Sequence, residues 1–128
     1  MNLVLDYDTL NTNNIYFNDS IKNTIMDNSK FIRILYSDEN IILNGLFLKI
    51  YKIENININI MLEKINSIEN NLLSRYNKNK YKVNKIREQL NYLLKKKSQD
   101  KIFILKISGI WETETMIGIT YKFILDSY

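Results

Sequence analysis

Aromatic rings and cations alternate along several apolar runs of this chain, and this is the residue pattern with the clearest chemical meaning. In "LFLKIY", Phe47, Lys49 and Tyr51 are spaced two residues apart. Residues two apart lie on one face of a strand. Single-stranded nucleic acid is bound by rings that stack on bases, each worth about 1–3 kcal/mol, beside cations that contact the phosphates. The pattern therefore predicts a strand surface that binds nucleic acid.

The candidate contacts on the predicted strands combine such rings with such cations. They are Arg33, Phe47, Lys49, Tyr51, Lys106, Trp111, Tyr121 and Lys122. Burial in the core is the alternative for each ring, because small cores need large apolar side chains. Trp111 and Tyr51 are the best candidates for exposure, since each lies near the end of a predicted strand beside polar residues.

Two acids lie beside the only Trp of the chain. Glu112 and Glu114 belong to the stretch "WETET", which starts at Trp111. A carboxylate next to a stacking ring repels phosphate. If Trp111 contacts DNA, both carboxylates must point away from the ring or contact a base edge. The alternative is that this stretch is a turn exposed to solvent.

A strongly basic segment runs from Arg75 to Lys101. It holds ten Lys or Arg against two acids, a net charge of +8, whereas the rest of the chain holds eight basic and twelve acidic residues, a net charge of −4. Such a segment attracts phosphates and steers association. The predicted contacts from this segment are Lys82, Lys85, Arg87, Lys95, Lys96 and Lys97. The alternative is a solvated helix face that is rich in Lys because the codons are AT-rich.

The chain contains neither Cys nor His. This removes disulfides, thiolate nucleophiles and imidazole acid–base catalysis, and it leaves zinc without its usual ligands. Asp6 and Asp8 share a face if they lie on a strand, but nothing else in the chain completes a Mg²⁺ site around them. P-loop, GxGxxG and nucleophile-elbow motifs are absent. We therefore expect no enzyme, with no catalytic residue, no metal and no cofactor.

The elements that must position these side chains form one domain, residues 1–128. Alternation of apolar residues predicts strands over about 15–53 and 101–126, and apolar spacings of three and four predict a helical segment over about 60–97. This order predicts an α+β fold, a curled antiparallel sheet that forms an OB-like barrel, with the helical segment between the third and fourth strands. The alternative is a plain α+β sheet with a helical hairpin on one face.

The last two predicted strands, "DKIFILKISGIWE" and "MIGITYKFILD", form a hairpin. Strict alternation places Trp111 on the face of Leu105 and Ile107, and it places Tyr121 on the face opposite Lys122. Both faces are too apolar for a strand that has one side in water. The hairpin is therefore expected to be a core element first, with only Trp111 and Tyr121 as candidates for contact.

The sequence also bears on where the protein acts. No apolar run approaches the ~20 residues that span a bilayer. The N-terminus carries acids instead of the basic region of a signal peptide. We therefore expect a cytosolic or nuclear protein that is not secreted and has no membrane partner.

Three stretches of the chain resemble a known family. "IKNTIMDNSKFIRILYS", "LNGLFLKI" and "ILKISGIWETETMIGITYKFI" are similar to the blocks of a short protein family of nucleocytoplasmic large DNA viruses, the giant viruses. The resemblance covers both ends of the chain and fades across the helical middle. It implies a viral protein of the host cytoplasm or nucleus, either a replication or transcription accessory or a virion component.

These observations predict a non-enzymatic viral accessory protein that binds nucleic acid, preferably single-stranded DNA, through strand aromatics and a basic helical segment. The alternative is a structural or assembly protein of the virion or viral factory, which binds another copy of itself or a viral protein partner. Nucleic-acid binding requires the rings and cations on one surface. Assembly requires an exposed apolar patch or an unpaired strand edge.

Overall fold

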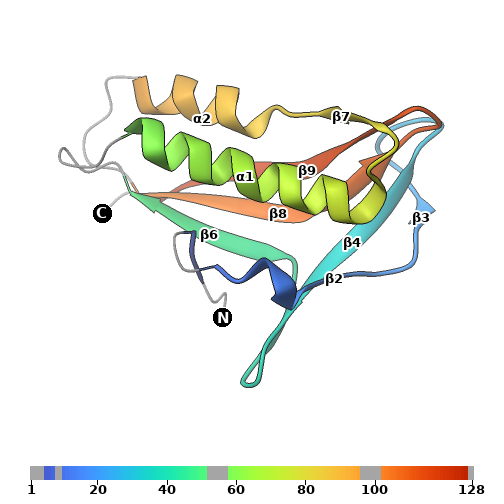
Figure 1. Ribbon diagram of the computed structural model, residues 1–128, viewed down its shortest axis with the longest axis horizontal. Coiled ribbons are helices and arrows are strands. Elements are labelled where there is room, and N and C mark those ends of the chain that lie inside the picture. The colour runs from blue at the N-terminus through green and yellow to red at the C-terminus, as the bar shows by residue number, and fades with distance from the viewer. Residues whose placement is uncertain (1–4, 8–9, 52–57, 96–101, 127–128) are drawn as a thin grey trace.

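The protein folds as a mixed sheet with two helices on one of its faces (Figure 1). The structure is a computed structural model, and it describes residues 5–7, 10–51, 58–95 and 102–126. The helices are α1 Ile58–Asn77 and α2 Ile86–Lys95, with a 3-10 turn at Thr12–Asn14. The strands are β1 Leu5–Asp6, β2 Ile15–Phe17, β3 Ile21–Lys22, β4 Lys30–Ser37, β5 Ile42–Asn44, β6 Leu46–Tyr51, β7 Tyr81–Val83, β8 Ile102–Glu112 and β9 Met116–Asp126.

Strand β8 is the centre of the sheet. Along one side it pairs with β9 over its whole length, antiparallel. Along the other side its first half pairs with β6 and its last residues pair with β4, both antiparallel. Strand β7 adds to β9 and β1 adds to β6, and both of these pairs are parallel. The sheet therefore has a long middle and short outer strands.

The second half of β4 leaves β8 and pairs with β2 and β5 instead. The β4–β5 hairpin projects from the body of the molecule (Figure 1). Its turn is closed by Asp38 Oδ1, which accepts hydrogen bonds from the N–H groups of Asn40 and Ile41 at 2.8 and 3.0 Å. Gly45 then takes a φ of 90° between β5 and β6, a conformation that costs glycine little.

The buried core lies between the sheet and the two helices. Apolar residues of α1 recur at three and four residues, so they form one stripe along the helix. Burial of each large apolar side chain contributes about 1.5–3 kcal/mol. The core includes Ile32 and Ile34 of β4, Leu46, Leu48 and Ile50 of β6, Leu105, Ile107 and Ile110 of β8, Ile117 and Ile119 of β9, Met61, Ile65, Leu72 and Leu73 of α1, and Ile86, Leu90 and Leu94 of α2.

The prediction of an OB-like barrel with a helical segment between the third and fourth strands is wrong. The sheet is mixed and not closed, and α1 follows β6, the sixth strand of the described chain. Strands β1, β2 and β3 have only two or three residues, too few for alternation to reveal them. The alternative of a plain sheet with helices on one face is nearer to this arrangement, although β7 separates the helices.

A β-bulge in β8 changes the face on which the end of this strand presents its side chains. Ile107 pairs with Tyr121, but the next pair is Gly109 with Thr120, so Ser108 is the additional residue. Tyr121 and Thr120 are neighbours in β9 and point to opposite faces. Gly109 and Trp111 therefore lie on the face opposite to Ile107. The expectation that Trp111 shares a face with Ile107 is wrong because one inserted residue reverses the alternation.

A buried acid joins the two helices. Glu69 of α1 is 1% exposed, and its Oε2 accepts a hydrogen bond from the N–H of Lys85 at 3.2 Å, just before α2 begins. Its Oε1 has no partner in the described part of the chain. Burial raises the pKa of Glu69, although the N–H groups of Lys85 and Ile86 act in the opposite direction.

We expect Glu69→Gln to stabilise the protein at neutral pH by about 1 kcal/mol, because a buried charge costs more than a buried amide. The folded state holds the Glu69 proton more tightly than the unfolded chain, so ionisation of Glu69 lowers stability as the pH rises through its folded-state pKa. Thermal unfolding should show the gain at neutral pH and lose it in acid. Glu63→Gln, at an exposed position of the same helix, removes only an exposed ion pair with Arg87 and should change stability little. Destabilisation of Glu69→Gln at neutral pH would contradict the expectation.

Candidate nucleic-acid interface

The face of the sheet that the helices leave uncovered, called the open face here, carries rings and cations from four strands. The pairing register and the strand alternation assign these rings and cations to the open face, together with Ile104, Thr120 and Ile124. The rings and cations are Phe31 and Arg33 of β4, Phe47 and Lys49 of β6, Lys106 and Trp111 of β8, and Lys122 of β9. Arg33 and Lys122 are exposed, and the other five are partly exposed.

One half of the open face is a row of three side chains across three strands. Phe47 pairs with Lys106, and Lys106 pairs with Lys122. The Nζ atom of Lys106 lies 5.5 Å from the centroid of the Phe47 ring, a cation–π contact. Like charges directly opposite one another across strands repel, and within the described residues neither ammonium group makes an ion pair. An anion bound between Lys106 and Lys122 would relieve this repulsion.

Lys49 is the next cation along β6. Its partner in the register is Asp6 of the parallel edge strand β1, so a carboxylate is adjacent to this lysine. This neighbour makes Lys49 a weaker phosphate contact than Lys106 or Lys122.

The other half of the open face is an aromatic surface that rests on two glycines. Trp111 pairs with Phe31 on one side and with Gly118 on the other. A Cβ atom at Gly118 would lie 2.4 Å from the Trp111 ring, and one at Gly109 would lie 2.8 Å from the Phe31 ring. Each ring therefore lies against a glycine, and both Phe31 and Trp111 are partly exposed. Nucleobases stack on ring surfaces of this kind.

Arg33 completes this half of the open face. Its guanidinium carbon lies 5.8 Å from the centroid of the Phe31 ring. An arginine beside a ring can contact a phosphate while a base stacks next to it. Phe31 was not among the predicted contacts. Phe31 and Arg33 are two residues apart and therefore share a face of β4, but only the register shows that Phe31 lies beside Trp111.

Glu112, the acid next to Trp111, does not share the open face. Glu112 points to the helical side, where Oε1 accepts a hydrogen bond from the Tyr76 hydroxyl at 2.8 Å and Oε2 lies 2.9 Å from Lys80 Nζ. Partial burial alone would raise the pKa of Glu112, but the hydrogen bonds from Lys80 and Tyr76 and the charges of Lys80 and Lys30 outweigh it and lower the pKa. Burial, together with Glu112, raises the pKa of Tyr76 to about 12.

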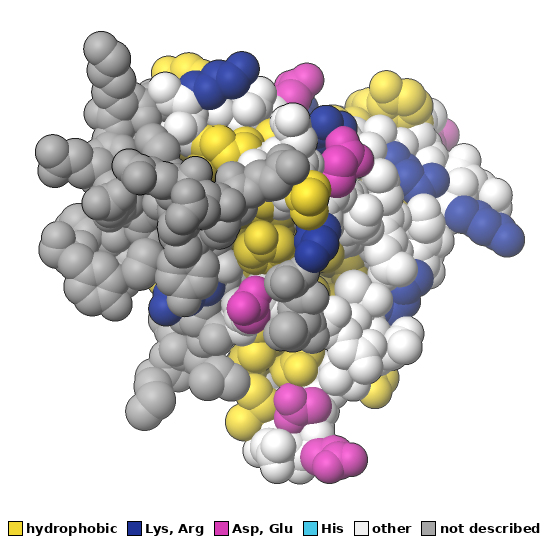
Figure 2. Space-filling view, turned by 60° about the vertical axis from the view of Figure 1, so that its left-hand side comes forward, with side chains coloured by type: hydrophobic (Ala, Val, Ile, Leu, Met, Phe, Trp, Pro, Cys, Tyr) yellow, Lys and Arg dark blue, Asp and Glu magenta, His cyan; other side chains and the backbone are white. Residues whose placement is uncertain are grey.

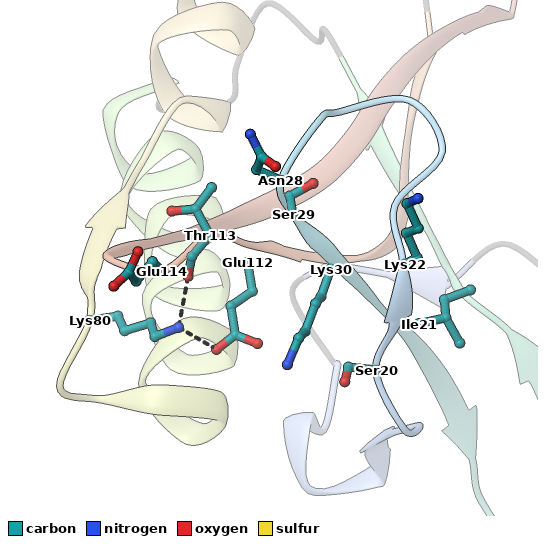
Figure 3. A pocket seen from close by; sticks show the side chains of 10 residues that line it. All are labelled: Ser20, Ile21, Lys22, Asn28, Ser29, Lys30, Lys80, Glu112, Thr113 and Glu114. Carbon is teal, nitrogen blue, oxygen red and sulfur yellow. Dashed lines mark hydrogen bonds and ion pairs between the residues drawn. The ribbon is translucent and has the colours of Figure 1, made fainter.

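Figure 3 shows the pocket in which this ion pair lies. The pocket measures ≈ 680 Å³, and its lining includes Lys22, Lys30, Lys80, Glu112 and Glu114. Lys80 is held by Glu112 and by the carbonyl oxygen of Thr113 at 2.7 Å. The two carboxylates disfavour a phosphate ligand, so this mixed-charge pocket is not part of the candidate interface.

Tyr121 points to the opposite side of the sheet from the other predicted strand contacts, although it lines a pocket with Arg33 and Trp111 at the edge of β9. Its hydroxyl donates to Gln89 Oε1 of α2 at 2.9 Å, and its ring meets Phe123 edge to face with centroids 5.7 Å apart. Burial is the largest of the effects that raise the pKa of Tyr121. The side chain therefore faces the helical layer, because it alternates with Thr120 and Lys122 of the open face.

The predicted cations of the helical segment are also separated from the open face. Lys82 Nζ donates to the carbonyl oxygen of Lys78 at 3.3 Å, and Arg87 pairs with Glu63 at 2.7 Å. Lys95 ends α2. Lys85 alone among these described cations shares a pocket with Trp111. Lys96, Lys97 and the side chain of Tyr51 lie outside the described residues.

The described residues show no group of three acids that could hold a metal ion, and Asp8 lies outside them. No helix in the described part of the chain is long and apolar enough to cross a membrane. No family model, no curated protein and no solved structure matches the chain. The role of the open face is therefore inferred from its own geometry.

Proposed function

We propose that the protein binds single-stranded nucleic acid on the open face. The observation that carries this proposal is the register, which brings Arg33, Phe47, Lys106, Trp111 and Lys122 together on the one side of the sheet that neither helix covers. In sequence these residues come from four separate strands. Their convergence meets the requirement for rings and cations on one surface.

The two halves of the open face have different roles in this proposal. Bases stack on Trp111 and Phe31, and phosphates contact Arg33, Lys106 and Lys122. Along β8 the distance from residue 106 to residue 111 is about 15 Å at the rise of a strand, the length of a few nucleotides. A single strand is favoured over a duplex because bases within a duplex already stack on one another and hide their surfaces.

The preference for DNA, the role as a non-enzymatic viral accessory protein, and action in the host cytoplasm or nucleus belong to the same proposal. They are supported by the resemblance to the viral family and by the absence of Cys and His.

A titration with a fluorescent single-stranded oligonucleotide at several salt concentrations tests the proposal, with anisotropy and Trp111 emission followed together. Three phosphate contacts predict a slope of log K against log salt of about −2, and stacking predicts quenching of Trp111. Salt-sensitive binding with unchanged Trp111 emission would place the strand elsewhere on the molecule. Absence of binding at low salt would overturn the proposal.

Assembly through protein contacts is the second candidate function. The β4–β5 hairpin projects from the body and carries Ile42, which is 74% exposed. Figure 2 shows acidic side chains at the lower end of the molecule, where the tip of this hairpin lies. An exposed apolar side chain beside acids suits a protein partner better than nucleic acid. Sedimentation of the purified protein over a range of concentrations shows whether the chain associates with itself.

A further inference from the structure

A second pocket lies beside the aromatic half of the open face. It measures ≈ 600 Å³, and it is bounded by the loop of residues 21–26, by Phe31, Arg33 and Trp111, and by the edge of β9 near Thr120. Its floor is thus continuous with the proposed stacking surface. The pocket of Figure 3 shares only Ile21 and Lys22 with it.

All the charged residues that line this pocket are basic. Lys22, Arg33 and Lys85 line it, and no Asp or Glu does. Asn23, Thr24 and Thr120 add amide and hydroxyl groups that can hydrogen-bond to a polar ligand. Planar rings, cations and neutral polar groups together suit a ligand with a flat aromatic part and a phosphate.

The loop over the pocket has a defined conformation. The Oδ1 atom of Asn23 accepts hydrogen bonds from the N–H groups of Ile25 and Met26 at 3.0 and 3.3 Å. The Asn23 N–H donates to the carbonyl oxygen of Ser29 at 3.1 Å, and the Ser29 hydroxyl donates to the carbonyl oxygen of Met26 at 2.7 Å. The loop nevertheless keeps Ile25 94% exposed. Because Ile25 also lines the pocket, its exposed side chain can contact a ligand bound there.

We propose that this pocket binds a single nucleotide. The base stacks on Trp111 and contacts Ile25 of the loop, and the phosphate lies among Lys22, Arg33 and Lys85. This inference rests on the proposed function, because Trp111 belongs to both sites. The nucleotide comes either from the bound strand, with one base turned out of its stack, or from free nucleoside monophosphate, and the chemistry that binds it is the same.

Titrations of the full chain with AMP, UMP and inorganic phosphate, followed by Trp111 emission, test the pocket. Both nucleotides should quench Trp111 with a Kd of about 1 mM, and phosphate alone should not. Ile25→Ser should weaken nucleotide binding about fivefold, since it removes the apolar contact to the base. Ile42→Ser is the matched control, because Ile42 is also exposed and lies on the β4–β5 hairpin. Its nucleotide affinity should equal that of the unaltered protein.

The outcomes separate the pocket from the open face. The pocket does not bind a nucleotide if the oligonucleotide binds and neither nucleotide changes Trp111 emission. The same conclusion follows if Ile25→Ser and Ile42→Ser lose nucleotide affinity equally. Both outcomes leave the proposed function intact. Nucleotide binding without oligonucleotide binding overturns the proposed function and leaves the pocket. The oligonucleotide should displace the nucleotide whichever source is right, because both stack on Trp111. If Ile25→Ser weakens oligonucleotide binding as well, a base of the bound strand enters the pocket; if it weakens nucleotide binding alone, the pocket takes the free nucleotide.

Discussion

Replacing Arg33, Lys106 and Lys122 together by Gln is expected to reduce the affinity for a single-stranded oligonucleotide about 100-fold at low salt, since three exposed charge contacts contribute about 1 kcal/mol each. The slope of log K against log salt should become less negative by about 2, because each lost phosphate contact removes about 0.7. Gln removes the charge and keeps a flexible polar side chain, although a shorter one than that of Lys or Arg. Anisotropy titrations at several salt concentrations measure both quantities.

The basic helical segment provides a matched control for this variant. Lys82, Arg87 and Lys95 also comprise two lysines and one arginine, and they lie on β7 and α2, away from the open face. Their replacement by Gln changes the net charge equally, so it should reduce the affinity only through the general field of the protein. If this control loses as much affinity as the open-face variant, the strand does not bind on the open face.

Gly109→Ala is expected to have the largest effect on stability, a loss of about 3 kcal/mol, which lowers the Tm by about 10 °C. A Cβ atom at this position would lie 2.2 Å from the carbonyl oxygen of Ile32 and 2.8 Å from the Phe31 ring. The oxygen belongs to the backbone of β4, so it can move only if the pairing of β4 with β8 is disturbed. Thermal or denaturant unfolding measures the loss.

Gly118→Ala separates the steric effect from the general cost of replacing a glycine. Its Cβ would also approach closely, at 2.4 Å, but the contacted atoms belong to the Trp111 side chain, which can turn away. We expect a smaller loss of stability, a change in Trp111 emission, and weaker oligonucleotide binding because the stacking ring is displaced. Equal stability of the two alanine variants would show that the contact with the Ile32 carbonyl oxygen is not the reason why Gly109→Ala destabilises the protein.

Regular alternation allowed the face of some site residues to be predicted. In β9, Lys122 and Tyr121 lie on opposite faces, as the sequence of "MIGITYKFILD" indicates, because this strand has no interruption. In β8 the same reasoning fails after Ile107. The bulge at Ser108 is defined by the pairing of β8 with β9, and the residues of β8 alone do not indicate it. It moves Trp111 to the face of Lys106.

The overall arrangement of the sheet was less predictable than its long strands. The run "KFIRILYS" coincides with β4, but this strand changes partners halfway, from β8 to β2 and β5. Two parallel edge pairs, β1 with β6 and β7 with β9, join segments far apart in the chain. Such pairings depend on contacts between distant residues, so no local pattern predicts them.

The sequence by itself determined which chemical groups the protein carries and how they are spaced. These are rings and cations that alternate on strands and a basic helical segment, with no thiol or imidazole group. Only the tertiary structure decided which of these side chains meet. It gathers Arg33, Phe47, Lys106, Trp111 and Lys122 on the open face, adds Phe31 beside Trp111, and turns the Tyr121 hydroxyl toward Gln89 of α2. The physical reason is that residue type and local period belong to neighbours in the chain, whereas register, bulges and the position of the helices arise from contacts between segments that are distant in sequence.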